Sequence, residues 1–256
     1  MKGADLRKPD LSTATFRNVK LYEADAELGR GASGTPAAIL QPRPFSANDT
    51  DACFHAAAFL KAIRLYDDLE RRGKPVWQSR GLLAIGRDRN DGARYHRFAK
   101  SGRLPSGHVE WLDAATASKK IGLDLPIGGA WLPSSGSLNT QALCQELVDG
   151  VVIRTKAEVH NIIRKGDIWR LIDPKGKTLG EAATVVLAAG HASEALSGFG
   201  KFGLVANRGQ VTFLHPHNDL AGQKASLSYG GYLTPAISWD DGDPVHVMGA
   251  SFQRIA

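Results

Sequence analysis

The stretch that most constrains this chain is LYEADAELGRGASG, from Leu21 to Gly34. An apolar strand end at Val19 and Leu21 leads to an acid, Glu23, and a glycine-rich loop follows. In a dinucleotide-binding unit, an acid at the tip of the second strand accepts hydrogen bonds from the ribose hydroxyls, and glycines let the backbone approach phosphates or a flavin. The spacing predicts this role for Glu23. The alternative interpretation is a solvent-edge acid followed by a mobile surface loop.

Several segments together resemble one family of flavoenzymes. The stretch LYEADAELGRGASGTPAAILQP (21–42) looks like the ribose-acid strand and flavin-facing loop of the D-amino-acid-oxidase-like FAD oxidoreductases, in particular those that modify the wobble uridine of tRNA. Further matching segments follow in family order: LPIGGAWLP (125–133), NTQALCQEL (139–147), VVLAAGHAS (185–193), NRGQV (207–211), GGYLTPA (230–236) and MGASF (248–252). The ordered recurrence of these segments is more specific than any one of them.

The resemblance implies a mixed α/β (α+β) fold, with a Rossmann-like FAD-binding domain interleaved with an antiparallel-sheet substrate domain. The FAD-binding domain is expected at residues 19–75 and 137–198, and the substrate domain at 76–136 and 199–256. The cofactor implied is FAD. The residues implied to bind it are Glu23, Arg30, Gly31, Ser33, Gly34, Val159, Ala189 and Gly190.

The beginning of the chain departs from the family pattern. The glycine turn of a dinucleotide-binding unit sits about 20 residues before the ribose acid, and counting back from Glu23 reaches only the single Gly3. Residues 1–18 are polar and include Pro9. We therefore expect an incomplete FAD domain that lacks its first strand and glycine turn. We also expect the final flavin-contacting segment to be missing, as in a chain truncated at both ends or a degenerate relative.

The resemblance implies oxidative removal of the carboxymethyl group from 5-carboxymethylaminomethyl-(2-thio)uridine in tRNA. A guanidinium suits a substrate carboxylate, so Arg208 is the first candidate, with Gln210 and Tyr232 as hydrogen-bonding neighbours; Arg208 as a plain surface charge is the alternative. No acid-base dyad or nucleophile stands out, because amine oxidation by a flavin requires mainly positioning. A separate methyltransferase is then expected to act on the product. Two other functions remain open: a flavin oxidase of glycine, sarcosine or a similar small amine, and a flavin-free remnant that at most binds RNA.

Composition says more about the compartment and the possible partners of the protein than about its reaction. The formal charge of +6 and sequence pI of about 9.4 suit a polyanion such as tRNA without establishing one. Cys53 and Cys144 are far apart and predict neither a disulfide framework nor a zinc site. His215, His217 and Asp219 are expected to be solvated loop residues, so no metal is predicted. The charged start and the lack of a long apolar run predict a cytoplasmic protein outside membranes.

Periodicity predicts the main elements. Residues 52–72 place Phe59, Ile63 and Leu69 at helical spacing, and residues 77–85 read as a strand. The basic segment 89–100 is expected to be a short helix or a loop. It would either face solvent with Tyr95 and Phe98 packed inward, or form an RNA-contacting patch. Other elements expected are helices at 113–120 and 137–149 and strands at 129–132, 151–154, 158–164, 168–172, 183–189, 203–214, 229–238 and 245–252.

Overall fold

The computed structural model describes residues 19–44, 50–198, 200, 203–239 and 242–254. The expected loss of a first strand and glycine turn concerns residues 1–18, which lie outside this described part. The chain forms two compact units, unit 1 from segments 1–28 and 148–200, and unit 2 from segments 29–147 and 201–256. The predicted boundaries of the FAD-binding and substrate domains stay a prediction.

Unit 1 contains a parallel strand pair and a separate antiparallel sheet. Strands β1 and β6 run parallel, with Lys20 opposite Val152 and Tyr22 opposite Arg154. Strands β7, β8 and β9 form a three-stranded antiparallel sheet. The elements of this unit are β1 (Lys20–Tyr22), β6 (Val152–Arg154), β7 (Asn161–Lys165), β8 (Ile168–Ile172), β9 (Thr178–Ala182), the 3-10 helix η3 (Gly190–Ala192) and α5 (Ser193–Ser197).

The segment 183–189 is not the buried strand that its apolar sequence predicted. It has no strand hydrogen-bonding pattern, and Val186 is 78% exposed. A strand buried on both faces needs a neighbouring strand and covering layers. Among the described residues no strand pairs with this segment, so the prediction of a core strand is wrong for this structure.

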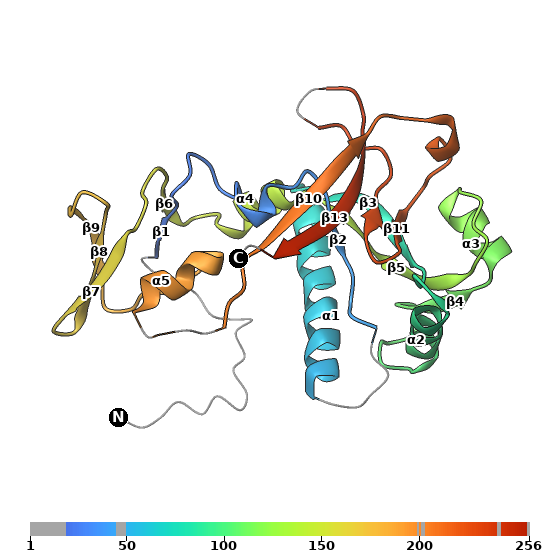
Figure 1. The fold of residues 1–256 in the computed structure, drawn as a ribbon, viewed down its shortest axis with the longest axis horizontal. Helices are drawn as coiled ribbons and strands as arrows, with labels where there is room; N and C mark the ends of the chain where they lie inside the picture. The colour runs from blue at the N-terminus through green and yellow to red at the C-terminus, as the bar shows by residue number, and fades with distance from the viewer. Residues whose placement is uncertain (1–18, 45–49, 199, 201–202, 240–241, 255–256) are drawn as a thin grey trace. The chain divides into compact units, whose positions relative to one another are not determined.

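Unit 2 is built around an eight-stranded sheet (Figure 1). The strand order is β10-β13-β12-β11-β3-β5-β2, with β4 also paired to β5. Only the pairing of β11 with β3 is parallel. The elements are η2 (Ala32–Gly34), β2 (Ala38–Leu40), α1 (Thr50–Arg71), β3 (Trp77–Ala84), α2 (Arg89–Lys100), β4 (Glu110–Leu112), α3 (Ala114–Ile121), β5 (Gly129–Leu138), α4 (Thr140–Leu147), β10 (Asn207–Leu214), η4 (Asn218–Leu220), β11 (Ser226–Ser228), β12 (Tyr232–Leu233) and β13 (His246–Arg254).

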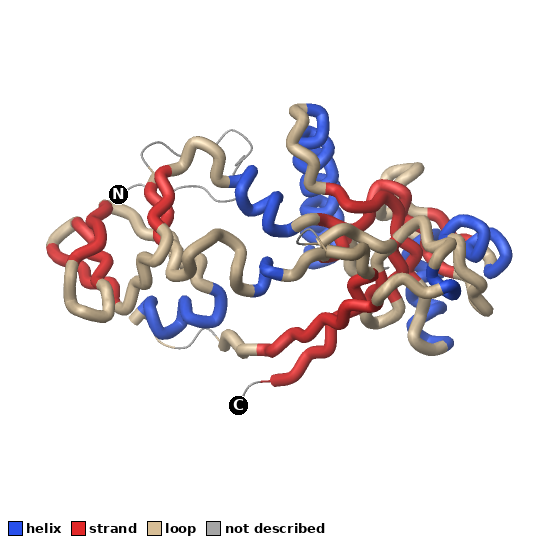
Figure 2. The backbone as a smooth tube through the Cα atoms, turned by 90° about the horizontal axis from the view of Figure 1, so that it is seen from above, coloured by secondary structure: helices blue, strands red, loops and turns tan. Residues whose placement is uncertain are grey.

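The two faces of this sheet carry different helices. Side chains alternate along a strand, so Leu82 and Ala84 of β3 pack with Phe59 of α1 and Phe98 of α2 on one face. Leu83 packs on the other face, with Ile121 of α3 among its neighbours. The period-two alternation of β3 thus separates the core into two clusters. Strands β10 and β13 pair as an antiparallel ribbon in which Asn207 lies opposite Arg254 (Figure 2).

The predicted helices of unit 2 are confirmed with small shifts. Helix α1 begins two residues before the predicted segment 52–72 and ends one residue before its end. Segment 89–100 is a helix rather than a loop, and the Asp88 side chain caps it by accepting a hydrogen bond from the Asp91 amide. Asp113 caps α3 as expected by accepting from the Thr116 amide. None of the helices in the described part of the chain combines the length and apolar character needed to cross a bilayer.

The helix predicted at 137–149 begins later than expected. Ser137 and Leu138 belong to β5, where they pair with β2 and β3, and α4 starts at Thr140. Leu147 is 53% exposed, and Leu143 is the buried residue of this helix. The predicted strand at 229–238 is also shorter, because β12 holds only Tyr232 and Leu233. Both errors arise because tertiary pairing, rather than periodicity, fixes the ends of these elements.

Candidate functional site

Glu23 stands at the end of a parallel strand, where a ribose acid is expected. It follows β1 directly and its amide donates to the Arg154 carbonyl, 2.9 Å away. The carboxylate is half-buried, and its Oε1 accepts from the Asp25 amide at 3.0 Å. A carboxylate has about four lone-pair positions, so this bond leaves acceptor capacity for two hydroxyls. The residue therefore fits the ribose end of a dinucleotide.

The segment that contains Val159 is tied to the same place in unit 1. The Ala157 amide donates to the Glu23 carbonyl and the Lys156 amide to the Asp25 carbonyl, each at 2.8 Å. Val159 follows two residues later and is half-buried. The structure thus brings the chain around Glu23 and Val159 together, which is the arrangement needed for an adenosine to contact both.

Ala189 and Gly190 form an exposed turn in unit 1. Gly190 has a φ of +57°, and the Ala189 amide donates to the Ser193 hydroxyl at 3.1 Å. The turn leads into η3 and α5. A glycine with positive φ and open space around its Cβ position suits backbone contact with a ligand. The assignment of these two residues to FAD stays a prediction.

The glycine-rich loop lies in unit 2, where η2 occupies its second half. Thr140 anchors the loop: its hydroxyl lies 2.8 Å from the Ser33 carbonyl and 2.9 Å from the Thr35 carbonyl. Arg30 and Gly31 are exposed, and a Cβ on Gly31 would meet nothing within 4 Å. The Gly34 amide donates to the Gly31 carbonyl at 2.9 Å, which closes the turn. The loop is held at its base and open at its tip, as a phosphate or flavin contact requires.

The three predicted substrate residues lie on β10 and β12 of unit 2, which are separated by β13 in the sheet. Arg208 and Gln210 are exposed and two residues apart on β10, so they share a face. Gln210 lines a cleft of about 340 Å³, together with Gly231 and Gly249. Tyr232 donates its hydroxyl to the Ala37 carbonyl at 2.9 Å, and burial raises the pKa of this phenol. Gln210 is thus at the cleft, while the Tyr232 hydroxyl is engaged with the protein.

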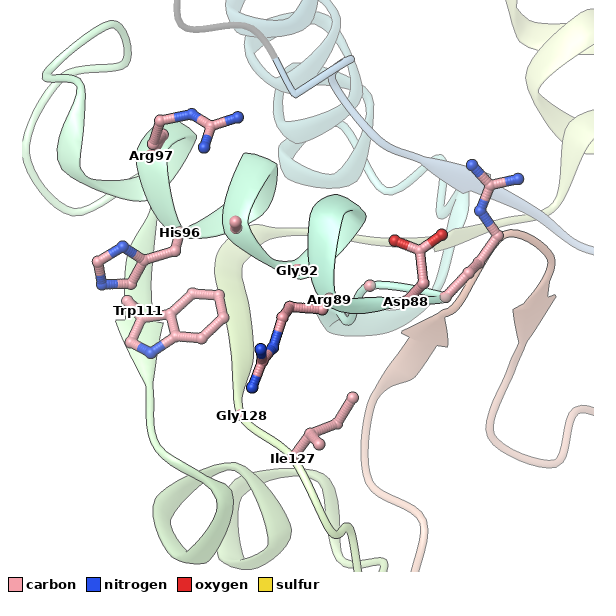
Figure 3. Close-up of a pocket in the computed structure, with 11 residues that line it drawn as sticks. Asp88, Arg89, Gly92, His96, Arg97, Trp111, Ile127 and Gly128 are labelled. Carbon is pink, nitrogen blue, oxygen red and sulfur yellow. The ribbon is translucent and has the colours of Figure 1, made fainter.

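A larger pocket of about 700 Å³ lies elsewhere in unit 2 (Figure 3). It is formed by α2, β4 and the turn before β5, and its lining includes Arg89, His96, Arg97, Trp111 and Ile127. The feature of the sequence that pointed to this region was the basic segment 89–100. Tyr95 and Phe98 of that segment are buried, as the solvent-facing interpretation predicted. The aromatic residue that reaches the pocket is Trp111, which the sequence analysis missed.

Asp91 of α2 binds two arginines, of which Arg87 lines this pocket. It is buried and accepts from Arg87 Nε at 3.1 Å and from Arg94 Nη2 at 2.7 Å. Burial raises the pKa of Asp91, but the Arg87 backbone and guanidinium hydrogen bonds and the charges of Arg94 and Arg87 outweigh it. The pKa of Asp91 therefore lies below its ordinary value. This carboxylate is ionised at neutral pH and holds both guanidinium groups in place.

Comparisons with known proteins place these observations in a family. A family model described as "FAD dependent oxidoreductase" matches residues 10–254. The bifunctional protein MnmC of tRNA 5-methylaminomethyl-2-thiouridine biosynthesis from Magnetococcus marinus is 32% identical over 236 residues, covering 92% of this chain and 35% of that protein. Its counterpart from Burkholderia vietnamiensis is 31% identical over 241 residues, with 92% and 36% covered. The chain thus spans about a third of the length of these curated relatives.

Solved structures show the same fold at low sequence identity. L-alpha-glycerophosphate oxidase from Mycoplasma pneumoniae, solved with FAD bound, aligns with a TM-score of 0.70 at 14% identity, covering 92% of this chain and 65% of that one. Glycine oxidase from Geobacillus kaustophilus aligns with a TM-score of 0.66 at 19% identity, with the same coverage of 92% and 65%. These likenesses confirm the predicted fold class. Because the family model matches nearly the whole chain, the chain belongs to the FAD-dependent oxidoreductase family, whose cofactor is FAD.

Proposed function

We propose that this chain oxidises the carboxymethylaminomethyl group of a tRNA wobble uridine, with or without the 2-thio group, and leaves an aminomethyl group. The observation that carries the proposal is sequence similarity over 92% of the chain to proteins named for tRNA 5-methylaminomethyl-2-thiouridine biosynthesis. Membership of the FAD-dependent oxidoreductase family supports the reaction class. The basic composition, with a formal charge of +6, supports a polyanionic substrate.

The residues of the chain bind and orient the substrate in this reaction. Bound FAD would supply a two-electron oxidation at the methylene carbon between amine and carboxylate. Hydrolysis of the resulting substrate imine would release glyoxylate and leave the primary amine. Arg208 offers a planar two-point contact to the carboxylate. Gln210 lines the cleft two residues further along the same face of β10. Glu23 holds the ribose hydroxyls of the cofactor.

The product of this step also implies a partner reaction. An aminomethyl group becomes the methylaminomethyl group in the relatives' name only by addition of one methyl group to the nitrogen. A methyltransferase must therefore act on the product. The substrate is a secondary amine, and its neutral form must reach the cofactor, because an ammonium nitrogen has no free electron pair to assist the oxidation.

The first test is turnover of modified tRNA by the full chain supplied with FAD. We expect conversion of 5-carboxymethylaminomethyl-uridine to 5-aminomethyluridine, measured by mass spectrometry of nucleosides, with stoichiometric release of glyoxylate. Arg208→Ala should raise KM roughly tenfold or more with a smaller effect on kcat, because it removes a charged contact to the substrate. Arg164→Ala, which removes an exposed arginine from β7, is the matched control.

Free glycine and sarcosine are assayed beside the tRNA. Activity on the free amines without activity on the modified tRNA would overturn the proposal and favour a small-amine oxidase. A protein that binds no FAD and turns over neither substrate would overturn it in favour of the flavin-free alternative.

A further inference from the structure

We propose that the pocket beside α2 is an RNA-binding site that holds an unpaired nucleotide by stacking its base and pairing its phosphates with arginine. The proposal deepens the proposed function and rests on it, since it names the surface that would hold the tRNA. The pocket contains none of the residues predicted for the cofactor or the substrate amine. Its volume of about 700 Å³ falls in the range of about 300–1,000 Å³ typical of ligand sites.

The apolar wall of the pocket suits a base. Trp111 is half-buried and meets His96 edge to face, with ring centroids 4.9 Å apart and an interplanar angle of 82°. This contact fixes the indole against α2 and leaves part of it on the pocket. Ile127, 44% exposed, lines the pocket from the turn before β5. An aromatic surface of this kind stacks any base and so tolerates sequence differences.

The arginines in and beside the pocket differ in whether they pair with a carboxylate. Arg87 and Arg94 both form an ion pair with Asp91, whose single negative charge offsets one of their two positive charges. Arg89 and Arg97 are exposed, and within the described part of the chain neither pairs with a carboxylate. His96 and Arg97 follow Arg89 by seven and eight positions, which is about two helical turns. The three residues therefore lie on one side of α2. Two uncompensated guanidinium groups therefore flank the aromatic wall.

The directions of these side chains support a phosphate contact. Figure 3 shows Arg89 extending into the space between Trp111 and Ile127, whereas Arg97 lies further along α2. The Asp88 carboxylate, which also lines the pocket, accepts from the Asp91 amide at 2.8 Å and so serves as the helix cap. A ligand with both a planar apolar group and a phosphate matches this combination. A nucleotide within RNA has both.

Glycines give the pocket its open side. Gly86 approaches the backbone of Gly92 so closely that a Cβ at position 86 would overlap it. A Cβ at Gly92 itself would meet nothing within 4 Å, although Gly92 lines the pocket. A side chain at position 92 would begin in this open space at the pocket wall, so a large one such as leucine is expected to reduce the room for a ligand. This substitution gives a test that leaves every charge in place.

The test measures binding of a fluorescent anticodon stem-loop RNA, without the modified uridine, by anisotropy over a range of salt concentrations. We expect Arg89→Ala/Arg97→Ala to weaken binding about tenfold or more and to reduce the salt slope by about two. Gly92→Leu should weaken binding similarly with an unchanged charge, while Gly92→Ala should bind like the wild type. Arg64→Ala/Arg71→Ala, which removes two exposed arginines of α1, should change affinity by less than about twofold.

Competitors separate an RNA site from a site for a free phosphate compound. Adenosine monophosphate and inorganic phosphate are added separately to the protein–RNA complex. We expect neither compound to displace the RNA at concentrations comparable to the Kd of the RNA. Displacement by either one at such concentrations would overturn the RNA assignment. Circular dichroism and thermal melting confirm that each variant is folded.

The outcomes distinguish this proposal from the proposed function. Equal RNA binding by the wild type, Arg89→Ala/Arg97→Ala and Gly92→Leu would overturn the pocket assignment, even if modified tRNA is oxidised. No RNA binding by the wild type would also overturn it. Loss of binding in the pocket variants would uphold it, even if the modified uridine is not oxidised.

Discussion

Asp91 shows how one buried carboxylate supports a local structure. It lies in the first turn of α2 and accepts hydrogen bonds from Arg87, in the loop after β3, and from Arg94 of the same helix. Its two partners are 63% and 47% exposed at their side chains, so water screens part of each charge. The carboxylate itself is largely out of water, and removing its charge leaves the two arginines with a weaker acceptor at this position.

Replacing Asp91 with Asn should lower stability and change its pH dependence. At neutral pH we expect a loss of about 1–2 kcal/mol, since hydrogen bonds to charged groups contribute about 1.5–3 kcal/mol and exposure of the arginines reduces this. Because its pKa is lower in the folded state, ionised Asp91 stabilises the fold at pH values above its unfolded pKa of about 3.9. This stabilisation is lost as the pH falls through the pKa of Asp91 in the folded protein. Urea unfolding of both proteins between about pH 6 and pH 3 measures this. If the free energies of unfolding of the wild type and Asp91→Asn fell in parallel with pH, the stabilising role of the Asp91 charge would be contradicted.

At the scale of elements, the irregular pairing of β3 with β5 is centred on a glycine, Gly81. The pairing of β3 with β5 shifts register between Arg80 and Leu82, and Gly81 between them has a φ of +87°. A Cβ there would overlap the Trp131 ring, which is buried against α3 and β11. The bulge therefore depends on both the left-handed backbone and the absence of a side chain.

Gly81→Ala should lower the free energy of unfolding by about 2–4 kcal/mol, because backbone strain and overpacking add. Gly92→Ala is the matched control: it lies in α2 with open space around its Cβ, and should be neutral or stabilising by up to about 1 kcal/mol. Chemical unfolding of both variants gives the two values. A loss below about 1 kcal/mol for Gly81→Ala would contradict the bulge argument.

At the scale of the whole molecule, both units supply residues predicted to bind FAD. Glu23, Val159, Ala189 and Gly190 lie in unit 1, and Arg30, Gly31, Ser33 and Gly34 lie in unit 2. A ligand that binds only the native state stabilises it in proportion to its affinity. Cofactor binding should therefore appear as a rise in the melting temperature of the full chain.

We expect FAD at a hundredfold excess over its Kd to stabilise the chain by about 2.7 kcal/mol. Glu23→Gln should weaken FAD binding about tenfold or more, because a neutral amide replaces a charged acceptor for the ribose hydroxyls. Glu158→Gln, which changes an exposed carboxylate of unit 1, is the control. Melting temperatures of the wild type, Glu23→Gln and Glu158→Gln are measured at increasing FAD concentrations. Equal rises in melting temperature for the wild type and Glu23→Gln would refute the role of Glu23.

The sequence by itself determined the elements whose pattern is local. Sequence pattern predicted the helices α1 and α3, and the strand end before Glu23 was correctly located, whereas segment 89–100 was expected to be either a helix or a loop. The ordered family segments also gave the fold class and the cofactor. These properties follow from residues that are neighbours along the chain or from motifs short enough to recognise, so no knowledge of distant contacts was needed.

Only the tertiary structure decided where the non-local contacts lie. An apolar run such as 183–189 is the same string whether a partner strand pairs with it or not, and here it stays exposed. The pocket likewise combines Arg89 of α2, Trp111 of β4 and Ile127 of a turn, which are far apart in sequence. Strand pairing and pocket formation depend on which segments meet in space, and single-residue preferences do not encode that.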